Sequence, residues 1–491
     1  MKISFKNIGV INSADIEICP LTVITGINDT GKSTVGRMLF TIIKAFSRYE
    51  EDLEVGEQEK IRSIFEILSE IFFEVRDKAN PNSPIFIRRK DGITGTVAYK
   101  HPVYSSVETE NIGPLLEEIS LIRQKAIKTN LHLLNVEKLI SILEILNGKL
   151  KPEDNLKLKI DKIKQIYTRE DQKTDLVERA LNKALFSEFY SELSISEISA
   201  INISEGQKKL IHFEVDKHKI KNFDYNDDLY YNEATFLESP VILHLYDALK
   251  YANTLFELRD KNYSLYRDRG RVPFHIKDLM TKLEKISYFT DFSAGINSYQ
   301  LKFSDYIEYN SENEEIIENT SENSLNKQKY NILTEISNTI NGNMGYSKDT
   351  KDFIYEKSIK NKKYKIRSIN TATGIKSFGL LQMLLQTDFL NERHLVIIDE
   401  PESGLHPEWQ LKYSETIVKL AKTGIPFLLT THSPYMVQAL SHYSNKENLS
   451  DKVKFYMAEK ENEFSNFIDV SNDLSRIFEK LSQPLEKVVY E

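Results

Sequence analysis

The feature that most constrains the fold of this 491-residue chain is a nine-residue loop, GINDTGKST, at residues 26–34. The loop fits the pattern G-x-x-x-x-G-K-[ST] at every constrained position. The apolar run at residues 21–25 before it is typical of a buried parallel strand, and residues 35–46 after it have helical character. A strand, a phosphate-binding loop and a helix in this order predict an α/β domain.

Each residue type in the loop suits the binding of a nucleoside triphosphate. Gly26 and Gly31 let backbone N–H groups wrap the phosphates, and the N-terminus of the following helix adds its positive dipole. Lys32 is expected to bridge β- and γ-phosphate oxygens, and the Ser33 hydroxyl to bind Mg²⁺. The residues predicted to hold ATP here are Gly26, Asn28, Asp29, Thr30, Gly31, Lys32, Ser33 and Thr34.

A second apolar strand, residues 394–398, ends in a pair of carboxylates. Acids at the end of a buried strand need a cation, so Asp399 is expected to hold Mg²⁺ through water and Glu400 to polarise the attacking water. A third strand, residues 426–431, is followed by His432, which is expected to hydrogen-bond the γ-phosphate or the attacking water. The predicted catalytic residues are Glu400, His432 and Lys32, and the predicted metal ligands are Ser33 and Asp399.

A helix predicted over residues 378–385 opens at Thr373 and Gly374. A small hydroxyl residue and a glycine at a helix N-terminus are typical of a second anion site, and a capped helix start is the simpler alternative. The order of all these motifs resembles the ABC-type ATPase heads of the RecF, SMC and OLD-like class. The resemblance covers about residues 1–46 and 340–445.

This resemblance implies that two heads act together. Thr373 and Gly374 match the signature loop of the family, which contacts ATP held by the other protomer, and Ser403 matches the D-loop at the dimer interface. ATP would then be sandwiched in a homodimer or a higher oligomer. No residue is assigned to the family's Q-loop glutamine, although a strand ending in Glu-Ser-Pro at residues 235–240 is similar to compact bacterial ATPases of this branch.

The predicted fold class is α/β, an ABC-ATPase head in which a mixed sheet with flanking helices is interrupted by a large, mainly helical insertion. The predicted parts are residues 1–50 and 336–491 for the head and 51–335 for the insertion, with helical arms at 51–195 and antiparallel strands and helices at 196–335. Alternating residues and lysines predict a hairpin over residues 200–224. A proline at position 152 and broken spacing argue against a long coiled coil in the arms.

Composition excludes several classes of protein. With 65 Lys and Arg against 73 Asp and Glu, the net charge of −8 excludes a uniformly basic nucleic-acid binder. Three local basic clusters with aromatic neighbours leave contact with DNA or RNA open, with solvated faces as the alternative: 88–90, 259–271 and 360–367. The single cysteine excludes an intramolecular disulfide, and the absence of a long apolar run predicts a cytoplasmic protein without a membrane segment.

Three functions fit these patterns. The favoured hypothesis is an ATP-hydrolysing sensor or regulatory subunit of a prokaryotic antiphage defence complex, because the chain resembles the PtuA-type ATPases that accompany an HNH nuclease in Septu and some retron loci. Neither a Toprim-like acidic cluster nor an HNH-type histidine pair is found, so nuclease activity is expected from a partner or another effector. The alternatives are a RecF-like DNA repair ATPase and a scaffold that binds nucleotide without hydrolysing it.

Overall fold

The chain folds into two compact units. In the computed structural model, one unit is Met1–Arg48 with Val177–Glu491, and the other is Tyr49–Leu176. The structure describes residues 1–47, 49–79, 86–88, 94–96, 112–128, 134–150, 154–168, 173–189, 198–216, 219–249, 272–289, 321–360, 362–387 and 389–481. No helix within these ranges is long and apolar enough to cross a lipid bilayer.

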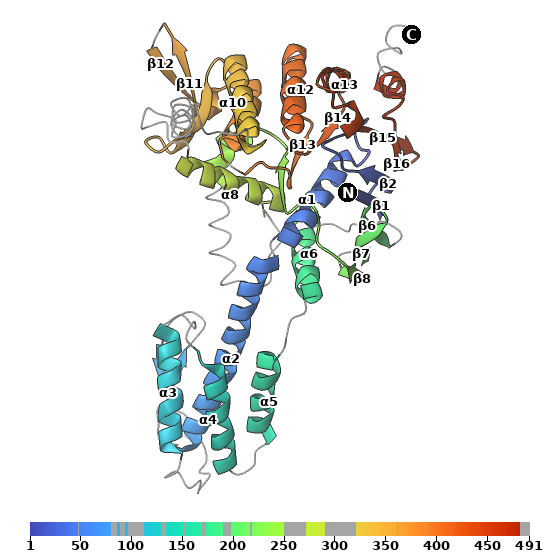
Figure 1. Cartoon of the computed structure of the whole chain (residues 1–491). Helices are drawn as coiled ribbons and strands as arrows, with labels where there is room; N and C mark the ends of the chain where they lie inside the picture. Colours follow the sequence, from blue (N-terminus) through green and yellow to red (C-terminus); the bar gives the residue numbers. More distant parts are fainter. Residues whose placement is uncertain are drawn as a thin grey trace. The chain divides into compact units, whose positions relative to one another are not determined.

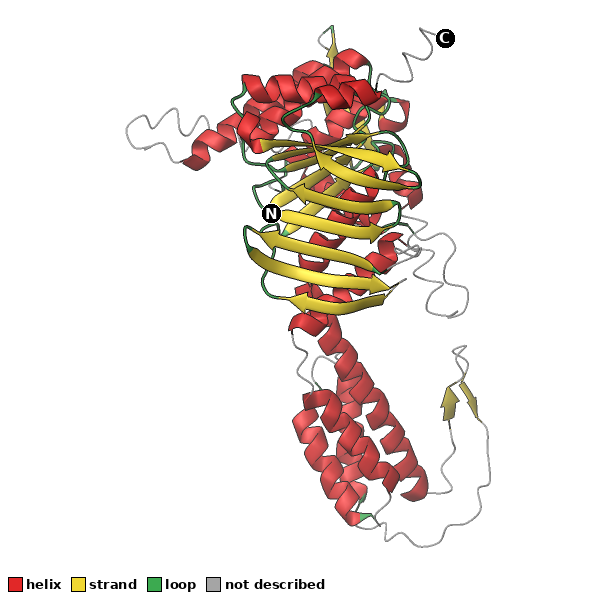
Figure 2. Cartoon of the chain, turned by 90° about the vertical axis from the view of Figure 1, so that its right-hand side faces the viewer, coloured by secondary structure: helices red, strands yellow, loops and turns green. Residues whose placement is uncertain are grey.

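A large sheet of described strands forms the centre of the first unit (Figure 1, Figure 2). Its order is β8 (Lys219–Tyr225), β7 (Lys208–Asp216), β6 (Ser199–Glu205), β1 (Lys2–Ile8), β2 (Ile11–Glu17), β16 (Phe464–Asp469), β15 (Val453–Glu461), β3 (Leu21–Gly26), β14 (Phe427–Thr431), β13 (His394–Asp399) and β9 (Glu233–Leu237). Strands β15, β3, β14, β13 and β9 are parallel, whereas β2, β1, β6, β7 and β8 are antiparallel. The predicted mixed α/β fold is confirmed.

Helices cover both faces of the parallel strands, whose side chains are buried throughout β3, β13 and β14. On one face lies α1 (Lys32–Ser47), where a Cβ on Gly36 would come within 3.0 Å of Ile397. The other face packs against α11 (Thr373–Leu385), α12 (Pro407–Lys422) and α13 (Pro434–Lys446) in one core that includes Val23, Ile398 and Leu429. Burial on both faces explains why these strands are nearly continuous apolar runs.

Residues 199–237 differ from the expected organisation. They were expected in the insertion, but β6 pairs with β1 and β9 pairs with β13, so these strands extend the main sheet at both edges. The expected hairpin over 200–224 is present as β6 and β7, with β8 as a third strand. The compact unit outside the main sheet, Tyr49–Leu176, is accordingly much shorter than the expected insertion 51–335.

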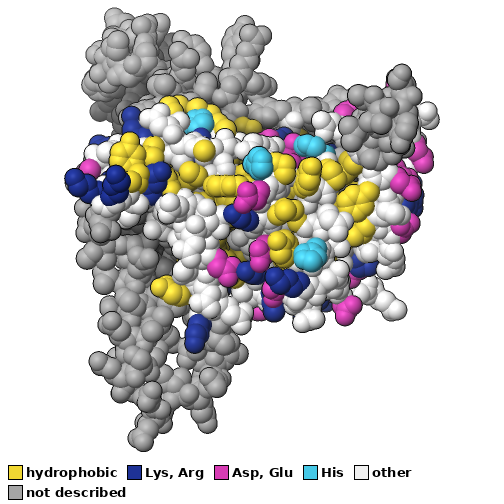
Figure 3. All heavy atoms as spheres, turned by 90° about the horizontal axis from the view of Figure 1, so that it is seen from above, with side chains coloured by type: hydrophobic (Ala, Val, Ile, Leu, Met, Phe, Trp, Pro, Cys, Tyr) yellow, Lys and Arg dark blue, Asp and Glu magenta, His cyan; other side chains and the backbone are white. Residues whose placement is uncertain are grey.

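A smaller sheet in the first unit contains β10 (Asn343–Ser347), β11 (Asp352–Ile359) and β12 (Lys362–Arg367). It follows α10 (Ser321–Ile340) along the chain, and its apolar side joins the same core as α11. Seen from above, Lys and Arg side chains lie beside hydrophobic ones at the left edge of the molecule, on the side where β11 and β12 lie in Figure 1 (Figure 3).

The second unit is built from α2 (Tyr49–Ala79), α3 (Gly113–Lys128), α4 (Val136–Lys149) and α5 (Asp154–Thr168). Its own apolar core includes Leu68, Ile119, Leu139 and Ile163. Two short strands, β4 (Phe86–Arg88) and β5 (Thr94–Thr96), pair with each other. Of the predicted basic clusters, 259–271 lies outside the described residues, as do the two residues after Arg88.

Candidate nucleotide-binding site

The loop at residues 26–34 connects β3 to α1, as the sequence predicts. Its backbone has positive φ at Gly26 (147°), Asp29 (61°) and Gly31 (83°). A Cβ on Gly26 would lie 2.7 Å from the carbonyl oxygen of Ala458, and one on Gly31 would lie 2.6 Å from Ile11. Both glycines are therefore required by packing as well as by backbone conformation.

Two side chains of the loop bond to the same backbone oxygen. Lys32 Nζ donates to the carbonyl oxygen of Ile27 at 2.8 Å, and the Thr30 hydroxyl donates to it at 2.9 Å. Lys32 is almost fully buried, and burial lowers its pKa against the attraction of Glu400 and Asp399. At the exposed side of the loop, Lys460 Nζ lies 2.8 Å from Asp29 Oδ2 and lowers the pKa of that carboxyl. The loop thus holds a buried cation at the N-terminus of α1.

The predicted metal ligands are in contact. Ser33 Oγ, at the start of α1, donates to Asp399 Oδ1 at 2.9 Å, and the Thr430 hydroxyl donates to the same oxygen. The sheet order β3, β14, β13 explains this, because the ends of neighbouring parallel strands meet at one edge. Burial raises the pKa of Asp399, although the hydrogen bonds from Thr430 and Ser33 oppose the rise. A hydroxyl and a carboxylate are oxygen donors of the kind Mg²⁺ prefers, so these residues fit the ion.

Glu400 follows β13 in a left-handed conformation, with φ of 49°. Its backbone N–H donates to the carbonyl oxygen of Thr430 at 3.0 Å, and its carboxylate Oε1 lies 3.4 Å from Nδ1 of His432. A non-glycine residue in this conformation costs on the order of 1–3 kcal/mol, and such strain is concentrated at functional sites. The strand end therefore brings the two predicted catalytic side chains together.

Glu402, which sequence reasoning did not assign, orients the segment that contains His432. Its Oε1 accepts hydrogen bonds from the Thr431 hydroxyl and the His432 backbone N–H, both at 2.7 Å, and from the Ser433 N–H at 3.1 Å. The same oxygen lies 3.3 Å from His432 Nδ1. Its buried Oε2 has no hydrogen-bond partner among the described residues. The signal was present in the sequence, as a carboxylate two positions after Glu400.

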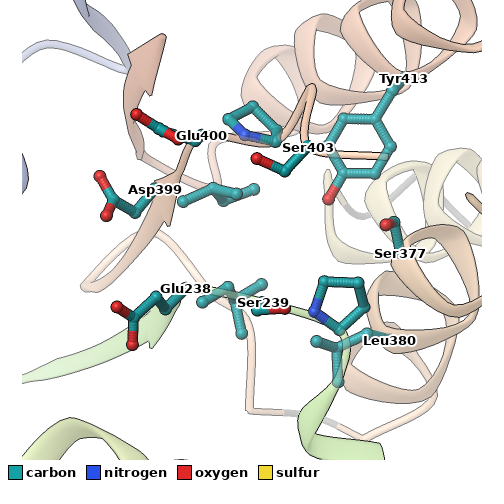
Figure 4. A pocket seen from close by; sticks show the side chains of 12 residues that line it. Glu238, Ser239, Ser377, Leu380, Asp399, Glu400, Ser403 and Tyr413 are labelled. Carbon is teal, nitrogen blue, oxygen red and sulfur yellow. The ribbon is translucent and has the colours of Figure 1, made fainter. Parts of the chain in front are cut away.

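Glu238 is a second residue that the sequence left unassigned. It comes directly after β9, the edge strand beside β13, and it lines a small pocket together with Asp399, Glu400 and Ser403 (Figure 4). The Glu-Ser-Pro ending of this strand is visible in the sequence, but only the strand order places Glu238 beside the two carboxylates. Three acidic residues therefore line one pocket.

The predicted signature and D-loop residues pack on each other. A Cβ on Gly404 would lie 2.9 Å from Thr373, and one on Gly374 would lie 2.7 Å from the Trp409 ring. The residue before α11 is Ala372, which makes no side-chain cap hydrogen bond, so the alternative of a side-chain-capped helix start is not what the structure has. The structure thus forms two groups of predicted residues, the loop with Asp399, Glu400 and His432, and Thr373 with Gly374 and the segment after Ser403.

Comparison with known proteins identifies part of this domain. Residues 232–438 match the family described as "AAA domain, putative AbiEii toxin, Type IV TA system". The match includes the two carboxylates after β13 and His432, and the phosphate-binding loop lies outside it. These residues are therefore similar to an AAA-type ATPase domain. No curated protein matches the chain in sequence.

Solved structures that match the chain include three SMC head domains. The head of Pyrococcus furiosus Smc with an extended coiled coil, bound to the C-terminal domain of ScpA, is 12% identical with a TM-score of 0.34, over 99% of this chain and 98% of that one. An SMC head bound to the C-winged helix domain of ScpA is 10% identical with a TM-score of 0.36, over 97% and 98%. The Thermotoga maritima head is 8% identical with a TM-score of 0.32, over 96% and 98%.

Proposed function

We propose that the chain binds and hydrolyses ATP as an ATPase of the SMC, RecF and OLD-like class. The observation that supports this best is the 2.9 Å hydrogen bond between Ser33 and Asp399, which are 366 positions apart in the chain. It joins the phosphate-binding loop to the strand end where Glu400 and His432 meet. The N–H groups of the loop and Lys32 would hold the phosphates, and Ser33 and Asp399 would hold Mg²⁺, which supplies positive charge for the phosphate oxygens.

In this proposal Glu400 accepts a hydrogen bond from the attacking water and orients it. His432 is held by Glu402 through its backbone N–H, so its ring stays beside the Glu400 carboxylate. Both side chains are about 40% exposed, 36% for Glu400 and 42% for His432, which leaves room for a substrate to reach them. The structure therefore supports hydrolysis over a scaffold that only binds nucleotide.

The same proposal includes a homodimer or a higher oligomer in which Thr373, Gly374 and Ser403 complete the nucleotide site of a second copy. Support comes from the packing of Thr373 on Gly404, which joins the two segments, and from the N-terminus of α11, whose N-cap residue Ala372 makes no side-chain cap hydrogen bond. A helix N-terminus with free N–H groups suits a phosphate. The rate per chain would then rise with chain concentration.

The substitution Lys32→Ala tests the proposed activity. Turnover of Mg²⁺–ATP should fall at least about 100-fold, because the loop loses the cation that contacts the phosphates. The matched control is Lys412→Ala, which removes an exposed lysine on α12 paired with Glu408 and should keep wild-type turnover. Phosphate release by the purified proteins measures both, and equal turnover by wild type and Lys32→Ala would exclude the site.

We further propose that the ATPase is the sensor or regulatory subunit of an antiphage defence complex that controls a partner nuclease, of the HNH type, or another effector. Support comes from the printed description of the matching family, which refers to a toxin of a toxin–antitoxin system. The test is co-purification with the products of neighbouring genes from the native host. Recovery of the chain without a nuclease or other effector, with and without ATP, would contradict this role.

Direct DNA binding, as in a RecF-like repair ATPase, is a second candidate that the hairpin of β11 and β12 favours. Residues 351–367 contain seven Lys and Arg against two acids in a chain of net charge −8. Tyr364 is 55% exposed between Lys363 and Lys365 on the edge strand β12. Exposed lysines next to an exposed aromatic ring suit phosphates and bases.

A DNA-binding assay with and without ATP separates the two candidates. Direct binding predicts an affinity that falls steeply with salt and that weakens at least about threefold in Lys362→Glu. The control is Lys412→Glu, which reverses a charge of the same kind on α12. Absence of ATP-dependent DNA affinity would leave the partner-controlling role.

A further inference from the structure

Four charged side chains next to the nucleotide site form a chain of hydrogen bonds, here called the His275 network. They are Arg37 on α1, Glu188 on α6 (Lys173–Phe189), Glu238 after β9 and His275 on α8 (Phe274–Phe289). All four lie in the same compact unit. Three of them come from the range expected as an insertion, so this range supplies neighbours to the phosphate-binding helix.

The hydrogen bonds of the network connect α6 to α1, and its two end members, Arg37 and Glu188, also form an ion pair of 3.8 Å. His275 Nδ1 lies 2.6 Å from Glu188 Oε1, and its Nε2 lies 3.0 Å from Glu238 Oε2. Arg37 Nη2 donates to the other oxygen of Glu238 at 2.6 Å. The backbone N–H of His275 donates to the second oxygen of Glu188 at 3.1 Å, which fixes the start of α8 on α6.

Both ring nitrogens of His275 face carboxylate oxygens. An ionised carboxylate has no proton to donate, so its oxygens can only accept hydrogen bonds. The ring must therefore donate twice, and only the protonated imidazolium has two N–H groups. The side chains of His275 and Glu188 are fully buried, and the rings of Phe40 and Phe236 lie against the imidazole. Burial lowers the pKa of His275, but the hydrogen bonds to Glu188 and Glu238 outweigh it and raise the pKa above its ordinary value.

The network reaches the site through Glu238. Its side chain is 38% exposed and lines the pocket that Asp399 and Glu400 also line (Figure 4). The hydrogen bond from His275 and the neighbouring Arg37 lower the pKa of Glu238 against the effect of burial, and the lowered pKa favours its ionised form. Loss of the His275 proton would remove one of the two hydrogen bonds that the imidazole donates, so that Glu238 would be held by Arg37 alone or Glu188 would lose its bond to the ring.

We propose that protonated His275 is a positioning residue of the ATPase, which holds the Glu238 carboxylate in the pocket beside Asp399 and Glu400 in the arrangement that hydrolysis needs. This inference rests on the proposed ATPase function. Glu238 then orients water at the site, and α6 and α8 are coupled to turnover through one imidazole. The reaction is fastest while His275 is charged. It slows as the pH rises through the His275 pKa, because the neutral ring can donate only one of its two hydrogen bonds to Glu188 and Glu238.

The charged groups around His275 decide which variants test this. Those that face it are Glu188 from α6, Glu238 from the end of β9 and Arg37 from α1, whereas Lys44, Glu233, Asp278 and Lys282 form a separate cluster farther along α1 and α8. Changes in that second cluster should leave the pH dependence of turnover as it is.

The test measures kcat and KM for ATP against pH. In His275→Gln we expect kcat to fall about tenfold at pH 7, because the Glu238 carboxylate is misplaced. KM should stay within about threefold of wild type, because the residues that bind ATP are unchanged. The alkaline decrease in kcat that wild type shows should be absent. Glu188→Gln removes one of the two negative charges that face the imidazolium, so the alkaline decrease in kcat should occur about one pH unit lower.

A matched control is His394→Gln, since His394 is also a buried histidine in this unit. It bonds to Thr235 and to the carbonyl oxygen of Phe389, and burial lowers its pKa to about 4, so it stays neutral in the assay range. This variant should keep the alkaline decrease. If His275→Gln keeps both the wild-type kcat and the same alkaline decrease, the proposed role of His275 is overturned.

A second measurement does not depend on turnover. In ¹⁵N-histidine-labelled protein, His275 should give an imidazolium signal that persists above pH 7 and is missing from His275→Gln. A neutral His275 ring at pH 7 would overturn the inference even if the chain hydrolyses ATP. Conversely, a wild-type chain that never hydrolyses ATP but shows this imidazolium would contradict the proposed function and leave the network itself established.

Discussion

Two clusters of buried charge lie on the same main sheet and differ in how their charges are balanced. At the candidate nucleotide site, the carboxylates of Asp399, Glu400 and Glu402 all act on the buried Lys32, and the charge of Arg37 acts on Asp399 as well. In the cluster between α1, β9 and α8, two lysines meet two acids, with Lys44 Nζ 2.7 Å from Glu233 and Lys282 Nζ 2.6 Å from Asp278. The second set is compensated, whereas the first has an excess of acid.

The pKa values follow this difference. At the site, burial lowers the pKa of Lys32 and raises that of Asp399, so both are shifted toward the neutral form. In the balanced cluster the ion pairs outweigh the effect of burial. They raise the pKa of Lys44 and lower the pKa of Glu233 to about 2. An uncompensated acidic group next to a phosphate-binding loop suits a bound cation and its nucleotide, whereas the balanced cluster needs nothing further.

Breaking the balanced cluster should have the largest effect on stability. Lys44→Met leaves Glu233 and Asp278 with one lysine, and the free energy of unfolding should fall by about 3–5 kcal/mol. Denaturant unfolding followed by circular dichroism measures it. Lys32→Met is the matched control. Burial already lowers the pKa of Lys32, so removal of this charge should cost less unfolding free energy than Lys44→Met. A larger loss in Lys32→Met would reverse the assignment of the two clusters.

At the site itself, Asp399→Asn should abolish activity without loss of stability. The amide keeps the shape and a hydrogen bond to Ser33 or Thr430 but lacks the charge that holds Mg²⁺, so turnover should fall at least about 100-fold. The melting temperature should stay the same or rise, because burial already disfavours the charged form. Phosphate release and thermal melting on one preparation measure both quantities. Wild-type turnover in this variant would show that Asp399 does not serve the cation.

Acid should weaken the balanced cluster through Glu233. Because its folded pKa is about 2 and its ordinary value is 4.5, its contribution to stability is present above about pH 5 and is lost as the pH falls toward 2. We expect about 2 kcal/mol of the acid-induced loss to come from this residue. The free energy of unfolding, measured from pH 6 to pH 3, should therefore decrease less steeply in Glu233→Gln than in wild type. The same slope in both proteins would contradict the pairing.

The smallest effect is expected where charge is fully exposed. Asp29→Asn breaks the ion pair with Lys460 but tolerates the left-handed backbone, so the melting temperature should stay within about 1 °C of wild type. Asp29→Val should melt several degrees lower, since a β-branched residue disfavours φ of 61°. Equal melting of the two variants would mean that the conformation of the loop is not constrained there.

The parts of the site predicted from sequence are those where a motif directly follows a buried parallel strand. The strands before Gly26, Asp399 and His432 are nearly continuous apolar runs, and parallel packing brings their ends together, so the meeting of Ser33 with Asp399 follows from local patterns. The mixed α/β sheet could be predicted for the same reason.

The remaining parts depend on pairing between distant segments. Residues 200–224 have a recognisable hairpin pattern, but nothing local shows that β6 pairs with β1, nearly 200 positions earlier. In the sequence, Glu238 is likewise only an acid that follows a short strand. Its role is visible only once β9 is known to pair with β13. His275 and Glu188 lie in helices of ordinary pattern, and only their bonds to each other and to Glu238 distinguish them.

The central claim is that the uncompensated cluster hydrolyses ATP. The most direct measurement is turnover by Glu400→Gln in parallel with its affinity for Mg²⁺–ATP. We predict wild-type affinity with turnover reduced at least about 100-fold, because the glutamine can no longer accept the proton of the attacking water. Turnover equal to that of wild type would contradict the account.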